Sequence, residues 1–270
     1  MRRRPMVSEQ EKNHFETFGY LLKKACYSRE EIGQITQVFD HVLDEDRQGE
    51  AFAGEKRQAV LGCIEKHQVL CNLVTDDRIF DIIHALLGDD FVWIGSDGNL
   101  YVGDTGWHPD GSQLGYARIK VAFYLDPVSR ETGCLRVIPG SHIPPLHDDL
   151  KPLGSQRADP SVSPFGVAPN EVPSVPLESN PGDMVFFNQN LWHASFGGRT
   201  GRRMFTLNFG EKPETDDHIA YLKHTYESNL GFVKSMQHTQ TGRVYEEAFL
   251  ESDSPRIKGM VAKLLELGFK

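Results

Sequence analysis

The sequence predicts a mainly β domain, a sandwich or jelly-roll barrel, with flanking helices at both ends of the chain. Seven short runs rich in β-branched and aromatic residues lie between residues 91 and 209, and Gly, Pro, Asn or Asp bounds each run. Helical patterns are confined to the segments before and after these runs. The 270 residues, 30.5 kDa in mass, contain no internal repeat and no clear linker, so we expect a single domain over 1–270.

Residues 1–90 are expected to form a helical N-terminal support for the sheet. Ser8 precedes an amphipathic segment, and Ser28 with Glu31 three residues later forms a capping box that predicts a second helix. A third helical segment is expected from about Arg57 to Leu87, because Gly88 is a typical helix end. These helices should cover one face of the β structure.

Residues 91–210 are expected to form the β core, interrupted by one long loop. The predicted strands are residues 91–95, 99–103, 118–125, 134–139, 174–178, 183–187 and 203–209. Residues 144–181 contain too much Pro, Ser and Asp for a strand core, so we expect a loop over the mouth of the barrel that acts as a mobile cover. Residues 211–270 return to helix, and Ser254 with Pro255 starts the last one.

Charge and cysteine content restrict the partners and the compartment. A net charge of −9 argues against nucleic acid or an anionic membrane surface as a partner. The apolar runs are too short to cross a bilayer, and no apolar region follows the basic run at residues 2–4, so no signal peptide is predicted. Four cysteines without Cys-x-x-Cys spacing are expected to be reduced thiols, which favours a cytoplasmic protein.

The segment Trp107-His108-Pro109-Asp110 carries the strongest indication of chemistry. In an extended backbone, the side chains of residues i and i+2 point to the same face, so His108 and Asp110 can coordinate one metal ion while Pro109 points away. Two further His-x-acid triplets, at residues 14–16 and 147–149, lie in a helical and a proline-flanked context that does not suit this geometry. With His193 downstream, the pair would complete a two-histidine, one-carboxylate set of the kind associated with non-haem Fe(II) oxygenases.

Two longer passages resemble the phytanoyl-CoA dioxygenase family, whose members are Fe(II)- and 2-oxoglutarate-dependent oxygenases. They are GYARIKVAFYLDPVSRETGCLRVIPGSH at 115–142 and PGDMVFFNQNLWHASFGGRTGRRMFTLNF at 181–209. The resemblance is specific over residues 98–210, vaguer before residue 90 and not visible after residue 212. It implies a double-stranded β-helix (jelly roll, cupin-like) that uses Fe(II), 2-oxoglutarate and O2, with His108, Asp110 and His193 as the metal ligands.

The same resemblance implies how 2-oxoglutarate would be held. The family's arginine on the strand after the distal histidine aligns with Arg202, and its hydroxyl-bearing helper to the same carboxylate aligns with Ser195. An arginine suits a carboxylate because its planar fork donates two charge-assisted hydrogen bonds. Arg203 should point to the opposite face of the strand. If the register were shifted by one residue, Arg203 would replace Arg202 as the clamp.

The substrate pocket is less clearly specified by the sequence. On the strand 118–125, Arg118 and Lys120 share one face and the apolar residues share the other, which should pack the core. Arg118 and Lys120 could reach an acidic substrate or 2-oxoglutarate, although solvated surface charge explains both cations at least as well. Further candidates for the pocket wall are Asn99, Trp107, Asn188 and Trp192.

These features predict a dioxygenase that hydroxylates an unactivated C–H bond of a small molecule and converts 2-oxoglutarate to succinate and CO2. Because Asp110 is present, hydroxylation is favoured over halogenation, for which related enzymes replace this carboxylate by a small residue. Two alternatives remain: a hydrolase or isomerase with Zn or Mn at the same triad, and a catalytically silent binding module. The sequence is compatible with a monomer or a homodimer.

Overall fold

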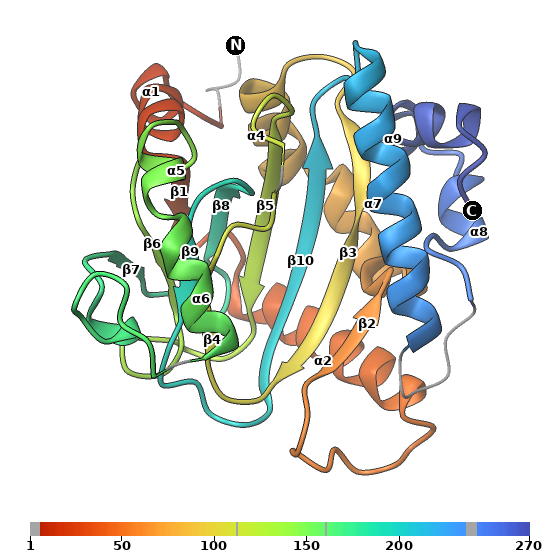
Figure 1. The fold of residues 1–270 in the computed structure, drawn as a ribbon. Coiled ribbons are helices and arrows are strands. Elements are labelled where there is room, and N and C mark those ends of the chain that lie inside the picture. Colours follow the sequence, from red (N-terminus) through yellow and green to blue (C-terminus); the bar gives the residue numbers. More distant parts are fainter. Residues whose placement is uncertain (1–5, 112, 160, 236–241) are drawn as a thin grey trace.

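Two antiparallel sheets face each other and helices cover the outer side of the larger one (Figure 1). A computed structural model describes residues 6–111, 113–159, 161–235 and 242–270. The six-stranded sheet has the order β1-β8-β5-β10-β3-β2, and the four-stranded sheet has the order β4-β9-β6-β7. This arrangement confirms the predicted jelly roll with flanking helices.

The strands are short, apart from two long strands in the centre of the larger sheet. Their bounds are β1 (Tyr20–Lys23), β2 (Gln58–Leu61), β3 (Val92–Tyr101), β4 (Thr105–His108), β5 (Arg118–Tyr124), β6 (Leu135–Val137), β7 (Val175–Leu177), β8 (Met184–Asn188), β9 (His193–Ser195) and β10 (Arg202–Gly210).

The helices fall mainly at the two ends of the chain, as expected. Their bounds are α1 (Glu9–Phe18), α2 (Arg29–Asp46), α3 (Gln68–Cys71), α4 (Asp77–Leu87), α5 (Leu146–Asp149), α6 (Ser155–Ala158), α7 (Asp216–Ser235), α8 (Glu247–Leu250) and α9 (Pro255–Glu266). Single 3-10 turns are η1 (Cys63–Lys66), η2 (Asn72–Thr75), η3 (Lys151–Gly154) and η4 (Pro169–Glu171).

Strand parity separates the core of the protein from the space between the sheets. On β5, Ile119, Val121 and Phe123 are buried in the main core with the covering helices, whereas Ala122 and Tyr124 face the other sheet. The same alternation on β10 places Phe205 and Leu207 in the main core. Its alternate residues therefore point between the sheets, where a site can form.

The predicted helix boundaries at the two ends of the chain are confirmed. Ser8 and Ser28 each form a capping box with the glutamate three residues later, and Gly88 caps α4 at its carboxyl end. Ser254 is the N-cap of α9, and Pro255 is its first residue.

The prediction of one helical segment from Arg57 to Leu87 is wrong in its first part. Residues 58–61 form β2, which pairs with β3 and has an alternating burial pattern, and the helix α4 begins only at Asp77. Likewise, residues 20–23 form β1 on the edge beside β8. In both places pairing with a distant strand overrides a local helical pattern, because the partner supplies the backbone hydrogen bonds.

The strands of the β core differ from the prediction in three ways. The runs at 91–95 and 99–103 form the single strand β3, and the two short strands β4 and β9 were not among the predicted ones. Residues 144–181 are not simply a loop, since they contain four short helical elements and β7. Trp107 donates a hydrogen bond to the Pro169 carbonyl, and Leu153 is fully buried against this tryptophan's cluster, so the segment is packed onto the four-stranded sheet.

Other expectations concern the membrane and the thiols. Among the described residues, no helix has the length and apolar character needed to cross a membrane. The four cysteines are free thiols, with Cys63 and Cys134 buried. The basic run at residues 2–4 lies outside the described residues.

Candidate active site

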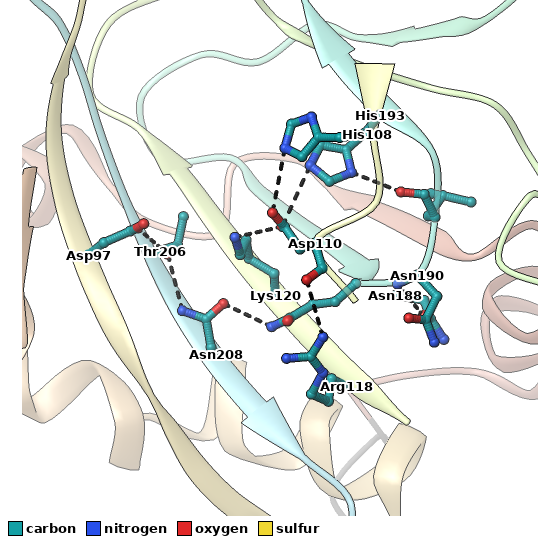
Figure 2. Close-up of polar contacts among 12 residues, drawn as sticks. Asp97, His108, Asp110, Arg118, Lys120, Asn188, Asn190, His193, Thr206 and Asn208 are labelled. Atoms are coloured by element: carbon teal, nitrogen blue, oxygen red, sulfur yellow. Dashed lines mark hydrogen bonds and ion pairs between the residues drawn. The ribbon is translucent and has the colours of Figure 1, made fainter. Parts of the chain in front are cut away.

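The predicted metal ligands come together between the two sheets. His108 at the end of β4 and His193 at the start of β9 are directly opposite each other in the antiparallel pair, with ring centroids 4.4 Å apart. Asp110 follows β4, and its two carboxylate oxygens lie 3.5 Å from the Nε2 atoms of His108 and His193 respectively (Figure 2). Among the described residues this is the one group of three or more His, Cys, Asp or Glu side chains that could hold a metal ion.

Both imidazoles are oriented by the same backbone device. The Nδ1 atom of His108 lies 2.8 Å from the Gly106 carbonyl oxygen, and that of His193 lies 2.8 Å from the Leu191 carbonyl oxygen. A carbonyl can only accept, so each neutral ring carries its proton on Nδ1 and presents the Nε2 lone pair toward Asp110. Burial lowers the pKa of His193 to about 3, which keeps this ring neutral and able to ligate a metal.

Lys120 on β5 connects the larger sheet to this group. Its Nζ lies 2.7 Å from Asp110 Oδ2 (Figure 2). Burial opposes ionisation of Asp110, but the positive charge of Lys120 favours it, and the pKa of the carboxyl is held well below its usual range. The Lys120 side chain is 16% exposed, so it is not the solvated surface charge that the sequence left open. The site therefore presents a charged carboxylate to a cation.

Arg202 on β10 lies in a cradle that only glycines provide. The side chain is buried, and Nη2 donates to Ser195 Oγ at 3.1 Å, which joins the two sheets. A Cβ atom at Gly133 or Gly198 would lie 1.7 or 1.8 Å from Arg202 Nη1. The Nε and Nη1 atoms have no hydrogen-bond partner within the described structure. Buried N–H donors without partners cost free energy, because they have lost their hydrogen bonds to water. A bound anion would offset that cost by accepting from this guanidinium.

Arg203 and Arg199 lie outside this site. Arg203 points to the opposite face and is paired with Asp126 at 2.8 Å and Asp40 at 2.9 Å. Arg199 is a largely exposed partner of the same Asp126. The strand parity expected from the sequence therefore holds, and Arg202 rather than Arg203 faces the metal ligands.

A cavity of about 140 Å³ contains the triad together with Lys120, Ser195 and Arg202. Several residues that line this cavity were not predicted from the sequence. Most of them lie on strands, and Arg57 directly precedes β2; they are Arg57, Asp97, Tyr101, Tyr124, Arg157 and Thr206. Tyr101 and Tyr124 could have been found from strand parity. Arg57 could not, because β2 was predicted as helix.

Four candidate wall residues do not line this cavity. Asn99 is buried and accepts a hydrogen bond from Arg57 Nε at 2.7 Å, so it acts on the cavity only through Arg57. Trp107 and Trp192 pack in the cluster under residues 150–172, and Asn188 accepts a bond from the Asn190 backbone. For the two tryptophans, the physical reason is that their N–H groups donate to the carbonyls of Pro169 and His147, away from the site.

A jelly roll with a partly buried two-histidine, one-carboxylate group beside a buried arginine that has unused donors defines a class of metal-dependent oxygenases. The family model for phytanoyl-CoA dioxygenase (PhyH) matches residues 15–205. A curated relative, a probable phytanoyl-CoA dioxygenase of Caenorhabditis elegans, is 22% identical over 227 residues, which is 72% of each chain.

Solved structures agree on the fold. The non-heme alpha ketoglutarate dependent carbocyclase SnoK from nogalamycin biosynthesis superposes with a TM-score of 0.59 at 20% identity, covering 80% of this chain and 90% of that one. EctD from S. alaskensis with bound Fe superposes with a TM-score of 0.57 at 20% identity, covering 78% of this chain and 79% of that one. The epimerase SnoN superposes with a TM-score of 0.59 at 18% identity, covering 79% of this chain and 87% of that one.

The chain belongs to the phytanoyl-CoA dioxygenase family, within the Fe(II)- and 2-oxoglutarate-dependent oxygenases. Both the fold and the family expected from the sequence are therefore confirmed. The matched region ends before α7, so the C-terminal helices lie outside the family model.

Proposed function

We propose that the protein is a dioxygenase that hydroxylates an unactivated C–H bond of a small molecule and converts 2-oxoglutarate to succinate and CO2. The observation that carries this proposal is Arg202, a buried cation with free donors that lines the same cavity as the triad. A hydrolase or isomerase with Zn or Mn at the triad has no need of it, and neither has a silent binding module.

The donor set suits the metal and the co-substrate. His108, His193 and Asp110 would hold Fe(II) through two neutral nitrogens and one anionic oxygen, leaving open positions on the ion. Bound Fe(II) supplies the redox chemistry that activates O2. Arg202 would bind the far carboxylate of 2-oxoglutarate, and Ser195 would orient the guanidinium while its own hydroxyl donates to the Gly133 carbonyl at 2.9 Å.

Lys120 would have an orienting and charge-balancing role. Its ammonium holds Asp110 in place and adds a positive charge to the cavity that would take a dicarboxylate. Asn99 would act indirectly, because its side-chain oxygen accepts a hydrogen bond from Arg57, which lines the cavity.

The proposal is tested by 2-oxoglutarate consumption with Fe(II), ascorbate and O2, in parallel with Zn-loaded protein. We expect succinate only with iron. Turnover of a substrate by the Zn-loaded protein without loss of 2-oxoglutarate would support the non-redox alternative, and silence with every metal would support the binding module. Incorporation of labelled oxygen into a product then separates hydroxylation from the ring closure and epimerisation for which SnoK and SnoN are named.

A further inference from the structure

A second cavity of about 320 Å³ adjoins the metal ligands on the side of α7. It shares Asp97, Asp110 and Lys120 with the smaller cavity, so a molecule bound in it would lie beside the triad. Its volume is at the lower end of the range typical of small-molecule sites. If 2-oxoglutarate occupies the Arg202 side, this cavity is the space left for the substrate.

Arg118, at the start of β5, is the unusual residue of this cavity. It is only 4% exposed, and its guanidinium stacks on the Tyr221 ring of α7 with Cζ 4.6 Å from the ring centroid. Among the described residues, the guanidinium makes one hydrogen bond, a long one from Nη2 to the backbone carbonyl of Asp110 at 3.4 Å (Figure 2), and Nε has no partner. A guanidinium carries five N–H donors, so most of its hydrogen-bonding capacity is unused.

The other charges of the cavity are paired. Asp110 is bonded to Lys120, and Asp97 accepts from Thr206 and lies 3.6 Å from Arg57. Within the described structure no acidic side chain lies within ion-pair distance of Arg118. A buried, unpaired cation is costly to the folded state, and an anionic ligand would offset that cost.

We propose that the substrate is a small hydrophilic acid whose carboxylate or phosphate group binds Arg118 in this cavity, under α7. This inference rests on the proposed function and names the substrate class of the same site. The wall is mainly polar, with Gln189 and Asn208 from the sheet side and Thr225, Ser228 and Asn229 from α7. Such a wall does not suit the alkyl chain of a fatty acyl thioester, because burying an aliphatic chain against polar groups leaves those groups without partners.

The helix α7 lies beyond the region matched by the family model, so this chain's own C-terminal segment closes the cavity. Figure 1 shows α7 alongside β3, on the side of the larger sheet that is remote from β6 and β7. The α7 wall would therefore lie beyond the matched region, whereas Arg118 itself lies within it.

The test measures binding by calorimetry, without O2, to protein loaded with Mn(II) and saturated with 2-oxoglutarate. The probes are small hydroxy acids, amino acids and sugar phosphates, each paired with its uncharged amide or unphosphorylated alcohol, and an acyl-CoA thioester. We expect at least one acid to bind tenfold or more tightly than its uncharged partner, and Arg118→Gln to abolish this preference. Arg118→Lys should restore part of it. A preference confined to carboxylates or to phosphates identifies which anion is used.

Two variants on α7 test the location. Thr225→Trp should fill the cavity and weaken binding of the preferred acid at least tenfold, whereas Glu227→Trp, at an exposed position of the same helix that does not line the cavity, should leave it unchanged. The proposal is overturned if no acid exceeds its uncharged partner, if the acyl-CoA binds best, or if Arg118→Gln keeps the preference. Uncoupled succinate formation without substrate tests the dioxygenase function separately, so the two failures are distinguishable.

Discussion

At the scale of single residues, the site depends on hydrogen bonds that orient a few side chains. The two imidazoles and the carboxylate reach one another because carbonyls at Gly106 and Leu191 fix the rings. Outer-sphere partners of this kind set the tautomer and the direction of the ligand lone pair. The protein has thus prepared the ligand set before the metal binds.

The first prediction concerns the metal. Replacing His108 by alanine should remove most of the bound iron and all turnover, because it strips one of only three protein ligands. His41→Ala is a suitable control, since His41 is exposed and remote from the cavity. Metal content after gel filtration measures the effect. Full iron occupancy in His108→Ala would remove the histidine from the ligand set.

The second prediction separates the two neighbouring arginines. Arg202→Ala should raise the KM for 2-oxoglutarate at least tenfold and leave iron content unchanged, since removing one member of a buried charge pair costs on the order of 2–5 kcal/mol. Arg203→Ala should leave this KM unchanged, because Arg203 binds Asp126 and Asp40 on the other face. The reverse ranking in initial-rate kinetics would transfer the clamp to Arg203.

At the scale of elements, the segment 144–181 is a packed layer on the four-stranded sheet. Leu153 is fully buried beside Trp107 and Trp192, and both tryptophans donate to carbonyls of this segment. A lid that opens as a whole would have to break these contacts. The mobile cover expected from the composition is therefore at odds with the packing around η3.

A third prediction follows from that packing. Leu153→Ala should lower the free energy of unfolding by about 2–5 kcal/mol, as large-to-small changes in a core do. Leu146→Ala, at an exposed position of α5, should change it by less than about 0.5 kcal/mol. Chemical denaturation measures both. A negligible effect of Leu153→Ala would mean that the segment is detached in solution and would restore the lid interpretation.

At the scale of the whole molecule, a buried carboxylate joins the sheet to the C-terminal region. Glu65 accepts from Trp93 Nε1 and from the backbone N–H of Glu246, each at 2.8 Å. Burial raises the pKa of this acid from 4.5 to about 8. Between these values the folded state holds a proton that the unfolded chain has lost, so stability falls as the pH rises through this range.

The fourth prediction is that metal-free protein loses stability from pH 7 to pH 8. In this window Glu65 still titrates, whereas His193, whose pKa is lowered on folding from 6.5, is already mostly neutral in the unfolded chain. The slope should reach at most about 1.4 kcal/mol per pH unit. Glu65→Gln should flatten the slope whatever it does to the absolute stability. Glu31→Gln should leave the slope unchanged, because the Glu31 pKa is lowered to about 2 and its contribution changes only at acid pH. Denaturant titrations across this window measure it, and an equal slope in Glu65→Gln would contradict the assignment.

The sequence alone determined the features that depend on local spacing. The shared face of His108 and Asp110 and the helix caps follow from local spacing, since the backbone period sets them. His193 and Arg202 were identified by the resemblance of their segments to the family's motifs. Tertiary structure decided what depends on distant partners: β1 and β2 became strands because β8 and β3 pair with them. It also left Arg118 buried and unpaired under Tyr221. No local pattern encodes which side chains meet across two sheets and a helix, because those contacts exist only once the chain has packed.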